Sequence, residues 1–265
     1  MGANRAAPAS RPRHRTKKAK SPHLGVPLAR AAAKQAASSI LGSRPRLEFR
    51  RGRVLPRAFY ERETEVVARA MLGTVLECET DAGTSSGIIV ETEAYLGEHD
   101  LACHAAVGRT ARTEHLYGPP GISYVYFIYG MYWCFNAVTR SEGLPSAVLV
   151  RALEPLDGLA LMHKRRPRIR NPGDLTNGPG KLCTALGITG SMSGKSLQRH
   201  PIVIREGEPV ADNQIEVTAR IGITKSADLP LRWLLRGNRH VSRGKVSARG
   251  PDSGGVGIGA LRKHP

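Results

Sequence analysis

Long apolar runs and closely spaced cysteines are both missing from this sequence of 265 residues. No segment approaches the ~20 consecutive apolar residues that a transmembrane helix needs, and the N-terminus lacks the apolar core of a secretory signal. We therefore expect no membrane partner. The cysteines, Cys78, Cys103, Cys134 and Cys183, form no C-x-x-C pair. Their spacing predicts reduced thiols and does not fit the usual zinc and redox motifs, so no metal site is expected.

Acidic residues are nearly absent from the first part of the chain. Residues 1–53 contain 14 Lys and Arg and only Glu48, a charge of +13, whereas the remainder has 26 basic and 21 acidic residues, a charge of +5. The total of +18 favours a polyanionic partner such as nucleic acid. Because residues 1–53 cannot bury enough apolar surface to order themselves, we predict a disordered basic arm. A transit peptide is the alternative.

The arm leaves the cellular address open. In a bacterium we expect the cytoplasm and nucleoid, with the arm as a DNA-binding tail. If the arm is a targeting signal, the alternative is the nucleus or an organelle.

A single domain is predicted over residues 54–240, followed by a flexible C-terminal tail over 241–265. Apolar spacing predicts a helix over 61–72, with Val66, Val67, Ala70 and Met71 on its buried stripe. Two further helices are expected to begin at Pro155 and Pro179. Strands are predicted over 74–78, 87–95, 123–136 as a hairpin, 146–150, 202–205 and 214–221. This order predicts an α+β fold, one mixed domain with a curved, mostly antiparallel sheet, flanking helices and a protruding β-hairpin.

Two glutamates lie in the strand predicted over 87–95 (GIIVETEAY). Alternation along a strand places Ile89, Glu91, Glu93 and Tyr95 on one face. Carboxylates inside a sheet are costly unless they are paired or used chemically. One glutamate is therefore a candidate base and the other a candidate member of a hydrogen-bond network. An edge strand with solvated glutamates is the alternative.

Aromatic residues are scarce, at 5%, yet four of the seven tyrosines fall within nine residues: Tyr124, Tyr126, Tyr129 and Tyr132. Gly130-Met131 predicts a type II′ turn, which places Tyr129 and Met131 at a hairpin tip. Aromatic cross-strand pairs stabilise hairpins by ~0.2–1 kcal/mol each, so a structural role is one interpretation. In a basic protein, an apolar tip also fits a wedge between DNA base steps.

Two other motifs need an interpretation. The basic run over 164–170, together with Arg109 and Arg112, is either a solvated face or a rim that contacts phosphates. Residues 190–196 (GSMSGKS) come close to a phosphate-binding loop but have three spacer residues where that loop needs about four, and they follow a helix stop. We interpret them as a surface turn.

Several segments in a consistent order resemble one known family. They are residues 90–97 (VETEAYLG), His104, 118–121 (GPPG), 124–136 (YVYFIYGMYWCFN), 148–155 (VLVRALEP), 178–186 (GPGKLCTAL) and 219–223 (ARIGI). Together they resemble the alkyladenine, or 3-methyladenine, DNA glycosylase family over about residues 54–240. The resemblance implies a monofunctional enzyme, monomeric and free of cofactor and metal. Such an enzyme flips a damaged purine out of double-stranded DNA and hydrolyses its N-glycosidic bond, leaving an abasic site.

The same resemblance implies roles for individual residues. Glu93 would deprotonate the attacking water, which Arg151 and the backbone carbonyl of Ile221 would hold. The base pocket would be lined by Tyr95, His104 and Tyr126, with Asn136 excluding the 2-amino group of guanine. The DNA contacts would be Tyr129 as the wedge, Met131, Arg109, Arg112 and Lys181.

The resemblance extends to substrates. It implies excision of 3-methyladenine and 7-methylguanine, with ethenoadenine and hypoxanthine as further candidates. Thr113 stands where the family usually has asparagine, and Leu116-Tyr117 where it has Met-Phe, which affects the local DNA contacts. Two alternatives remain: a non-catalytic nucleic-acid-binding module with the same fold, and an architectural protein whose basic arm does the binding.

Overall fold

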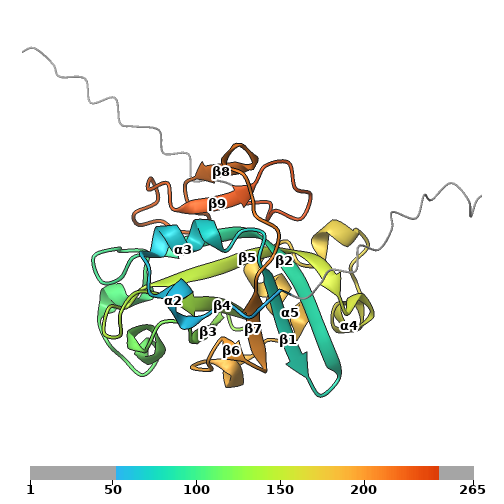
Figure 1. Ribbon diagram of the computed structural model, residues 1–265, viewed down its shortest axis with the longest axis horizontal. Helices are drawn as coiled ribbons and strands as arrows, with labels where there is room; N and C mark the ends of the chain where they lie inside the picture. The colour runs from blue at the N-terminus through green and yellow to red at the C-terminus, as the bar shows by residue number, and fades with distance from the viewer. Residues whose placement is uncertain (1–51, 245–265) are drawn as a thin grey trace, which may run out of the picture. The chain divides into compact units, whose positions relative to one another are not determined.

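The computed structural model describes residues 52–244, so most of the predicted arm over 1–53 and most of the predicted tail over 241–265 lie outside the described residues. The described part is an α+β domain, as the sequence predicted. All its strand pairs are antiparallel, in one sheet with the order β3-β4-β5-β2-β1-β7-β6. Strand β9 pairs with both β2 and β8 (Figure 1).

The helices are short and the two central strands are long. The helices are α2 (Arg57–Tyr60), α3 (Thr64–Ala70), α4 (Leu159–Arg165) and α5 (Pro179–Leu186). The strands are β1 (Val75–Thr80), β2 (Gly83–Tyr95), β3 (Ser123–Ile128), β4 (Tyr132–Val138), β5 (Ala147–Asp157), β6 (Gln198–Arg199), β7 (Ile202–Arg205), β8 (Ile215–Thr218) and β9 (Arg232–Leu235). Helix α3, cyan in Figure 1, packs against β2, β5 and β9. No helix within the described range 52–244 is long and apolar enough to cross a membrane.

Strand β2 changes its neighbour on one side near Val90. Residues 83–88 pair with β1, whereas residues 91–93 pair with β9. Against β5 the register shifts between Ile89 and Glu91, so that Val90 is the extra residue of a β-bulge. The bulge therefore marks the point where the sheet divides between β1 and β9.

This bulge also changes which side chains share a face. The prediction that Ile89 lies on the same face as Glu91 is wrong, because Ile89 belongs to the main hydrophobic core together with Ala94. One inserted residue reverses the alternation before the bulge relative to that after it. Glu91, Glu93 and Tyr95 then share the opposite face, away from the core.

Helix α3 is shorter than the predicted 61–72, and its buried stripe is rotated. The buried side chains are those of Thr64, Val67, Ala68 and the following Met71, a spacing of three to four residues that forms one helical face. Val66, predicted to be buried, is 49% exposed. The hydroxyl of Thr64 bonds to Thr139 at 2.9 Å, so a polar residue occupies the position expected for an apolar one.

The boundary between β5 and α4 differs from the prediction. A helix was expected to begin at Pro155, but β5 continues to Asp157, and Pro155 lies opposite Gly87 where the register shifts. Proline is tolerated at such an irregularity because the regular ladder is already interrupted. Helix α4 begins after Gly158, whose φ of 74° ends the strand.

The end of the sheet was only partly predicted. The strand expected over 214–221 corresponds to β8, which is shorter. Strand β9 was not predicted. Its four residues, RWLL, have no alternation of polar and apolar side chains, so periodicity alone could not identify them. The helix predicted from Pro179 to a stop at Gly187 is α5, and Gly187 has the left-handed conformation of a C-terminal cap.

The predicted hairpin is the β3–β4 pair, but its turn differs. Ile128 lies opposite Tyr132, and the amide of Met131 donates to the carbonyl of Ile128 at 3.2 Å. The central residues are therefore Tyr129 and Gly130, with φ of 54° and 66°. Two positive φ values are typical of a type I′ turn, so the predicted type II′ turn at Gly130-Met131 is wrong. That the hairpin protrudes stays a prediction.

The two faces of the sheet bury different things. One face packs against α3 and α5 in the main core, which includes Val125, Phe135, Val150 and Leu153. The other face has a smaller cluster around Tyr124, Leu116 and Val138. The four cysteines are buried and free, as the spacing predicted.

Candidate active site

Sheet register brings predicted site residues from different strands onto one face. Tyr124 lies opposite Asn136, Asn136 opposite Leu149, and Leu149 opposite Glu93, so these residues form a row across β3, β4, β5 and β2. Their neighbours in sequence point into the main core. The face of the row is therefore free to carry polar and aromatic groups.

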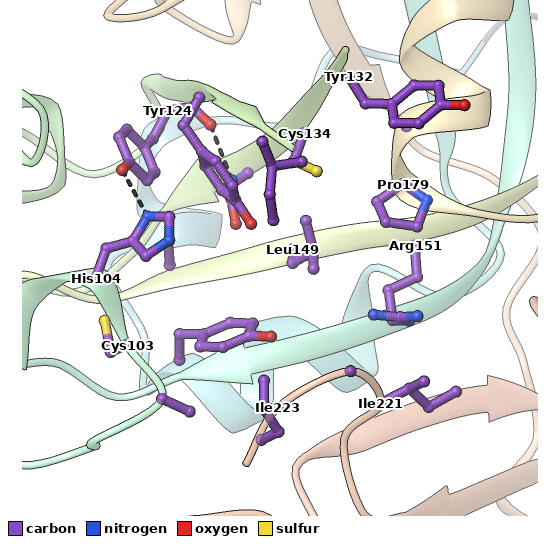
Figure 2. A pocket seen from close by; sticks show the side chains of 18 of the residues that line it. Cys103, His104, Tyr124, Tyr132, Cys134, Leu149, Arg151, Pro179, Ile221 and Ile223 are labelled. Atoms are coloured by element: carbon purple, nitrogen blue, oxygen red, sulfur yellow. Dashed lines mark hydrogen bonds between the residues drawn. The ribbon is translucent and has the colours of Figure 1, made fainter. Parts of the chain in front are cut away.

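A cavity of about 350 Å³ opens on this face, within the usual size range of small-ligand pockets. It contains seven of the predicted site residues: Tyr95, His104, Tyr126, Tyr129, Asn136, Arg151 and Ile221. Figure 2 shows His104 and Tyr124 at one end of the cavity, Tyr132, Pro179 and Arg151 at the other, and Leu149 between them. A side chain at Gly180 would collide with Tyr132, so glycine lets α5 approach the hairpin here.

Glu93 is fully buried beside this cavity and bonds to three of the residues around it. Its Oε2 accepts from the hydroxyl of Tyr95 at 2.9 Å and from Nη1 of Arg151 at 3.1 Å, and its Oε1 accepts from the amide of Ile221 at 2.8 Å. A carboxylate has about four lone-pair positions, so one remains on Oε1. The contacts thus fix the carboxylate and leave it an acceptor position.

Glu91 is the centre of a second, denser network. It accepts from Nε of Arg151 at 3.0 Å, from Nε of Arg232 at 2.7 Å, and from the amide and hydroxyl of Ser242 at 2.7 and 2.8 Å. Arg151 therefore bridges both glutamates, with its guanidinium spread between them. Burial alone would lower the pKa of Arg151, but the charges of Glu93 and Glu91 outweigh it and raise that pKa. Glu91 therefore lies in a hydrogen-bond network of the kind predicted for one of the two glutamates, and the role of the other as a base stays a prediction.

Tyr95 connects the carboxylate to the aromatic wall. Burial and the nearby charge of Glu93 raise the pKa of the Tyr95 phenol well above its ordinary value. The phenol is therefore neutral at physiological pH, and its hydroxyl donates a hydrogen bond to Glu93. The guanidinium of Arg220 lies over the ring of Tyr95, with Cζ 4.7 Å from the ring centre.

His104 forms the end of the cavity with two tyrosines. Its Nδ1 lies 2.9 Å from the hydroxyl of Tyr124, and its ring meets that of Tyr126 edge-on at 4.3 Å. Burial, and secondly the charge of Arg112, lower the pKa of His104. The imidazole is therefore neutral at pH 7 and above, and it adds no positive charge to the cavity.

The lowered pKa of His104 predicts a pH dependence of stability. As the pH falls, the imidazole of the unfolded chain takes up a proton near pH 6.5, whereas that of the folded protein takes it up only at a lower pH. The contribution of the neutral His104 to the free energy of unfolding is therefore present above about pH 6.5 and is lost as the pH falls below it. We expect His104→Gln to reduce the loss of unfolding free energy between pH 7.5 and pH 5, measured by urea denaturation. The exposed His99→Gln is the control, and equal pH profiles for wild type and His104→Gln would contradict the prediction.

The residues at the hairpin tip are exposed. Tyr129 is 76% exposed and Met131 64%, and Tyr129 also borders the cavity. A positive φ is unfavourable for a bulky residue such as tyrosine, and strain of this kind persists mainly at functional positions. The conformation of Tyr129 thus indicates a role outside the packing of the domain.

Three predicted DNA contacts lie outside the cavity and have protein partners. Arg109 pairs with Glu114 through contacts of 2.6 and 2.9 Å. Arg112 donates to the carbonyl of Phe127 at 3.2 Å, and Lys181 donates to the side chain of Asn177 at 2.7 Å. Burial, and secondarily the charges of Arg166 and Arg243, lower the pKa of Lys181 against the opposing effect of Asp174. Contact of these residues with DNA stays a prediction.

Thr113, which differs from the usual family residue, has a structural role here. Its side chain is buried, and its hydroxyl accepts from the amide of Thr110 at 2.8 Å and donates to the carbonyl of Gly108 at 3.0 Å. It therefore closes the turn before the hairpin.

Within residues 52–244, no group of three or more His, Cys, Asp or Glu is arranged to hold a metal ion.

Sequence reasoning missed four residues that hold the site together. They are Asp100, Arg220, Arg232 and Ser242. Each acts through a contact between segments far apart in the chain, which no local pattern reveals. Ser242 falls in the segment predicted as a flexible tail, of which residues 241–244 are described.

Comparison with known proteins agrees with this geometry. A family model described as methylpurine-DNA glycosylase matches residues 58–239. A protein of Myxococcus xanthus (strain DK1622) is 46% identical over 198 residues, which cover 74% of this chain and 96% of that protein. A protein of Methanoculleus marisnigri is 50% identical over 192 residues, covering 71% and 98%, and one of Carboxydothermus hydrogenoformans is 45% identical over 191 residues, covering 72% and 99%.

Each of these relatives carries the name "Putative 3-methyladenine DNA glycosylase". The match covers the sheet, the cavity and the residues around Glu93. The chain therefore belongs to the methylpurine-DNA glycosylase family and is a DNA glycosylase, a hydrolase of DNA repair.

Proposed function

We propose that this enzyme excises 3-methyladenine and 7-methylguanine from double-stranded DNA, and ethenoadenine and hypoxanthine as further substrates. The single observation that carries the proposal is the fully buried Glu93 carboxylate, which three donors hold at the wall of an aromatic cavity with an acceptor position left on Oε1. A nucleotide flipped out of the duplex brings its glycosidic bond to such a group. The family match supports the reaction class.

Glu93 acts as the general base in this mechanism. Its free acceptor position takes a proton from a water molecule, whose oxygen attacks C1′ of the sugar. The C1′–N bond breaks, its electron pair leaves with the base, and an abasic site remains. Arg151 and the backbone carbonyl of Ile221 hold the water. A cationic alkylated purine is already a good leaving group, so one carboxylate suffices where glycosidases commonly use two.

The cavity selects the base by stacking and by shape. Tyr95 and Tyr126 present aromatic rings, which attract a cationic base by ~0.5–2 kcal/mol more than a neutral one. The amide of Asn136 donates to the carbonyl of Tyr124 at 3.0 Å, which fixes the side chain in the row. In that position Asn136 excludes the 2-amino group of normal guanine.

Tyr129 is the wedge that fills the gap left by the flipped nucleotide. We expect Tyr129→Ala to weaken binding to lesion-containing duplex by about 1–3 kcal/mol, because stacking of that size is lost, with a smaller loss on single strands. Dissociation constants for both substrates test this. Val66→Ala, which removes another exposed side chain, is the control. Equal losses on duplex and single strand would contradict the wedge.

Excision kinetics test the function as a whole. Wild-type protein in excess is mixed with duplexes that carry one of the four lesions, and alkali cleaves the strand wherever an abasic site has formed. We expect excision of the two cationic lesions, and a stable complex without any product would instead support the non-catalytic module. The rates for ethenoadenine and hypoxanthine define the range of neutral substrates.

The partner is duplex DNA, and the enzyme works as a monomer. Its location is that of the DNA, which is the nucleoid if the chain is bacterial.

Removal of residues 1–51 leaves every described residue in place. We expect excision by the shortened chain to persist, and the salt dependence of its DNA binding to become less steep because fewer phosphates are neutralised. Loss of nearly all binding and excision would favour the architectural alternative.

A further inference from the structure

A buried arginine lies against an aromatic wall of the cavity. Cζ of Arg220 is 4.7 Å from the centre of the Tyr95 ring, and Tyr95 lines the cavity. Arg220 donates to the backbone carbonyls of Ala94 at 2.9 Å and Ser226 at 3.1 Å, which fix its position. Arginine stays charged in proteins, so a permanent cation stands beside the proposed site of the base.

Asp100 neutralises this cation. Its two carboxylate oxygens accept from Nη1 and Nη2 of Arg220 at 2.6 and 2.8 Å, a bidentate pair. It also accepts from the amides of Leu96 and Ala102, both at 3.1 Å. Burial would raise the pKa of Asp100, but the bonds and charge of Arg220 outweigh burial and lower it. Both groups are therefore ionised at neutral pH.

The ion pairs beside the cavity balance one another in charge. Within residues 52–244, Arg151 and Arg232 face Glu91 and Glu93 in one network, while Arg220 faces Asp100 in the other. A positively charged base stacked in the cavity then meets two ion-pair networks of no net charge, and Arg112, with Cζ 5.9 Å from the centre of the Tyr126 ring, is a further positive group at the end of the cavity. Removal of the Asp100 charge alone would leave Arg220 to repel the base.

We propose that Asp100 sets the preference of the pocket for charged over neutral bases, because it cancels the positive charge of Arg220 on the ring of Tyr95. This inference rests on the proposed function. Asp100 is then a specificity-determining residue that acts through Arg220 without contacting the base. It also ties the turn that precedes His104 to the loop that carries Ile221, so its effect on charge must be separated from its effect on position.

Coulomb's law gives the expected size of the effect. An unbalanced unit charge about 10 Å from a cationic base, at an effective dielectric constant of about 20, changes the affinity for that base roughly tenfold. The affinity for a neutral base of similar size changes far less. The ratio of the two affinities therefore reports the charge, whereas a displaced wall changes both affinities together.

The experiment uses the full chain at pH 8 and two duplexes that differ only in the lesion. A 7-methylguanine duplex gives the half-saturating concentration for the cationic base in single-turnover excision. An ethenoadenine duplex, added as a competitor, gives the inhibition constant for the neutral base even where that base is not excised. The variants are Asp100→Asn, Arg220→Gln and the double variant, and Glu77→Gln is a control at a buried ion pair with Arg205 on β1 and β7.

The variants should shift the cationic-to-neutral preference in opposite directions. We expect a roughly tenfold decrease for Asp100→Asn, an increase for Arg220→Gln, and a return to the wild-type ratio for the double variant, with no change for Glu77→Gln. Equal weakening for both lesions in all three variants would overturn the inference and leave a structural pair. A wild type that excises neither lesion would overturn the proposed function itself. If Asp100→Asn fails to fold, the cationic-to-neutral ratio can still be measured on the double variant, which leaves no unpaired charge.

Discussion

Replacement of Glu93 by glutamine is expected to lower the single-turnover rate of excision at least ~10³-fold while lesion binding is retained. General base catalysis contributes about 10²–10⁴-fold, and here a single carboxylate carries it. Glutamine matches glutamate in size, but its amide cannot take the proton from water. It also replaces one carboxylate oxygen by an amino group, so part of the set of contacts from Tyr95, Arg151 and Ile221 is lost while the remaining oxygen still accepts.

The matched control for this variant is Glu77→Gln. Glu77 is also a buried glutamate with an arginine partner, Arg205, which contacts both of its carboxylate oxygens, but it lies on β1 outside the cavity. We expect it to excise at the wild-type rate. Excision by Glu93→Gln at the wild-type rate would show that the base is a different group. Thermal unfolding of both variants distinguishes loss of the base from loss of the fold.

Local pattern was sufficient to predict the strands that carry the site, whereas most roles of the residues on them were implied by the family resemblance. The glutamate-containing strand, the aromatic hairpin and the strand over 146–150 that precedes Arg151 were all predicted from β-branched and aromatic runs, because such runs fit half-buried pleated surfaces. Once β3, β4 and β5 pair in sequence order and β5 pairs with the earlier strand β2, antiparallel register fixes the row from Tyr124 to Glu93. Local sequence therefore accounts for much of the cavity.

What could not be predicted depends on irregularities and on long-range pairs. The bulge at Val90 reverses the face of Ile89, and no composition signal marks a single inserted residue. Strand β9 is four residues long and gains its place by pairing with β2 and β8. Asp100 and Arg220 are 120 residues apart, so only the folded chain shows that they meet. Prediction from sequence failed where tertiary contact, rather than local preference, decides the structure.

Substitution of Arg151 by lysine is expected to lower the excision rate about 100-fold with lesion binding nearly unchanged. The guanidinium donates through Nε to Glu91 and through Nη1 to Glu93, so it fixes the two carboxylates relative to each other. A lysine keeps the charge but concentrates it at one atom, which cannot bridge both partners in the same geometry. Misplacement of a catalytic group by about 1 Å costs of the order of 10²-fold.

The control that separates this effect from a general loss of packing is Arg205→Lys. Arg205 also donates through two nitrogens to buried carboxylate oxygens, but both oxygens belong to one glutamate, Glu77, at contacts of 3.0 and 3.3 Å, away from the cavity. If both lysine variants lose similar stability but only Arg151→Lys loses rate, the guanidinium of Arg151 acts on the reaction by positioning Glu93 and the water. A parallel loss of binding and rate in Arg151→Lys would instead make Arg151 a contact for the DNA. Equal rates in wild type and Arg151→Lys would mean that Tyr95 and Ile221 hold Glu93 without its help.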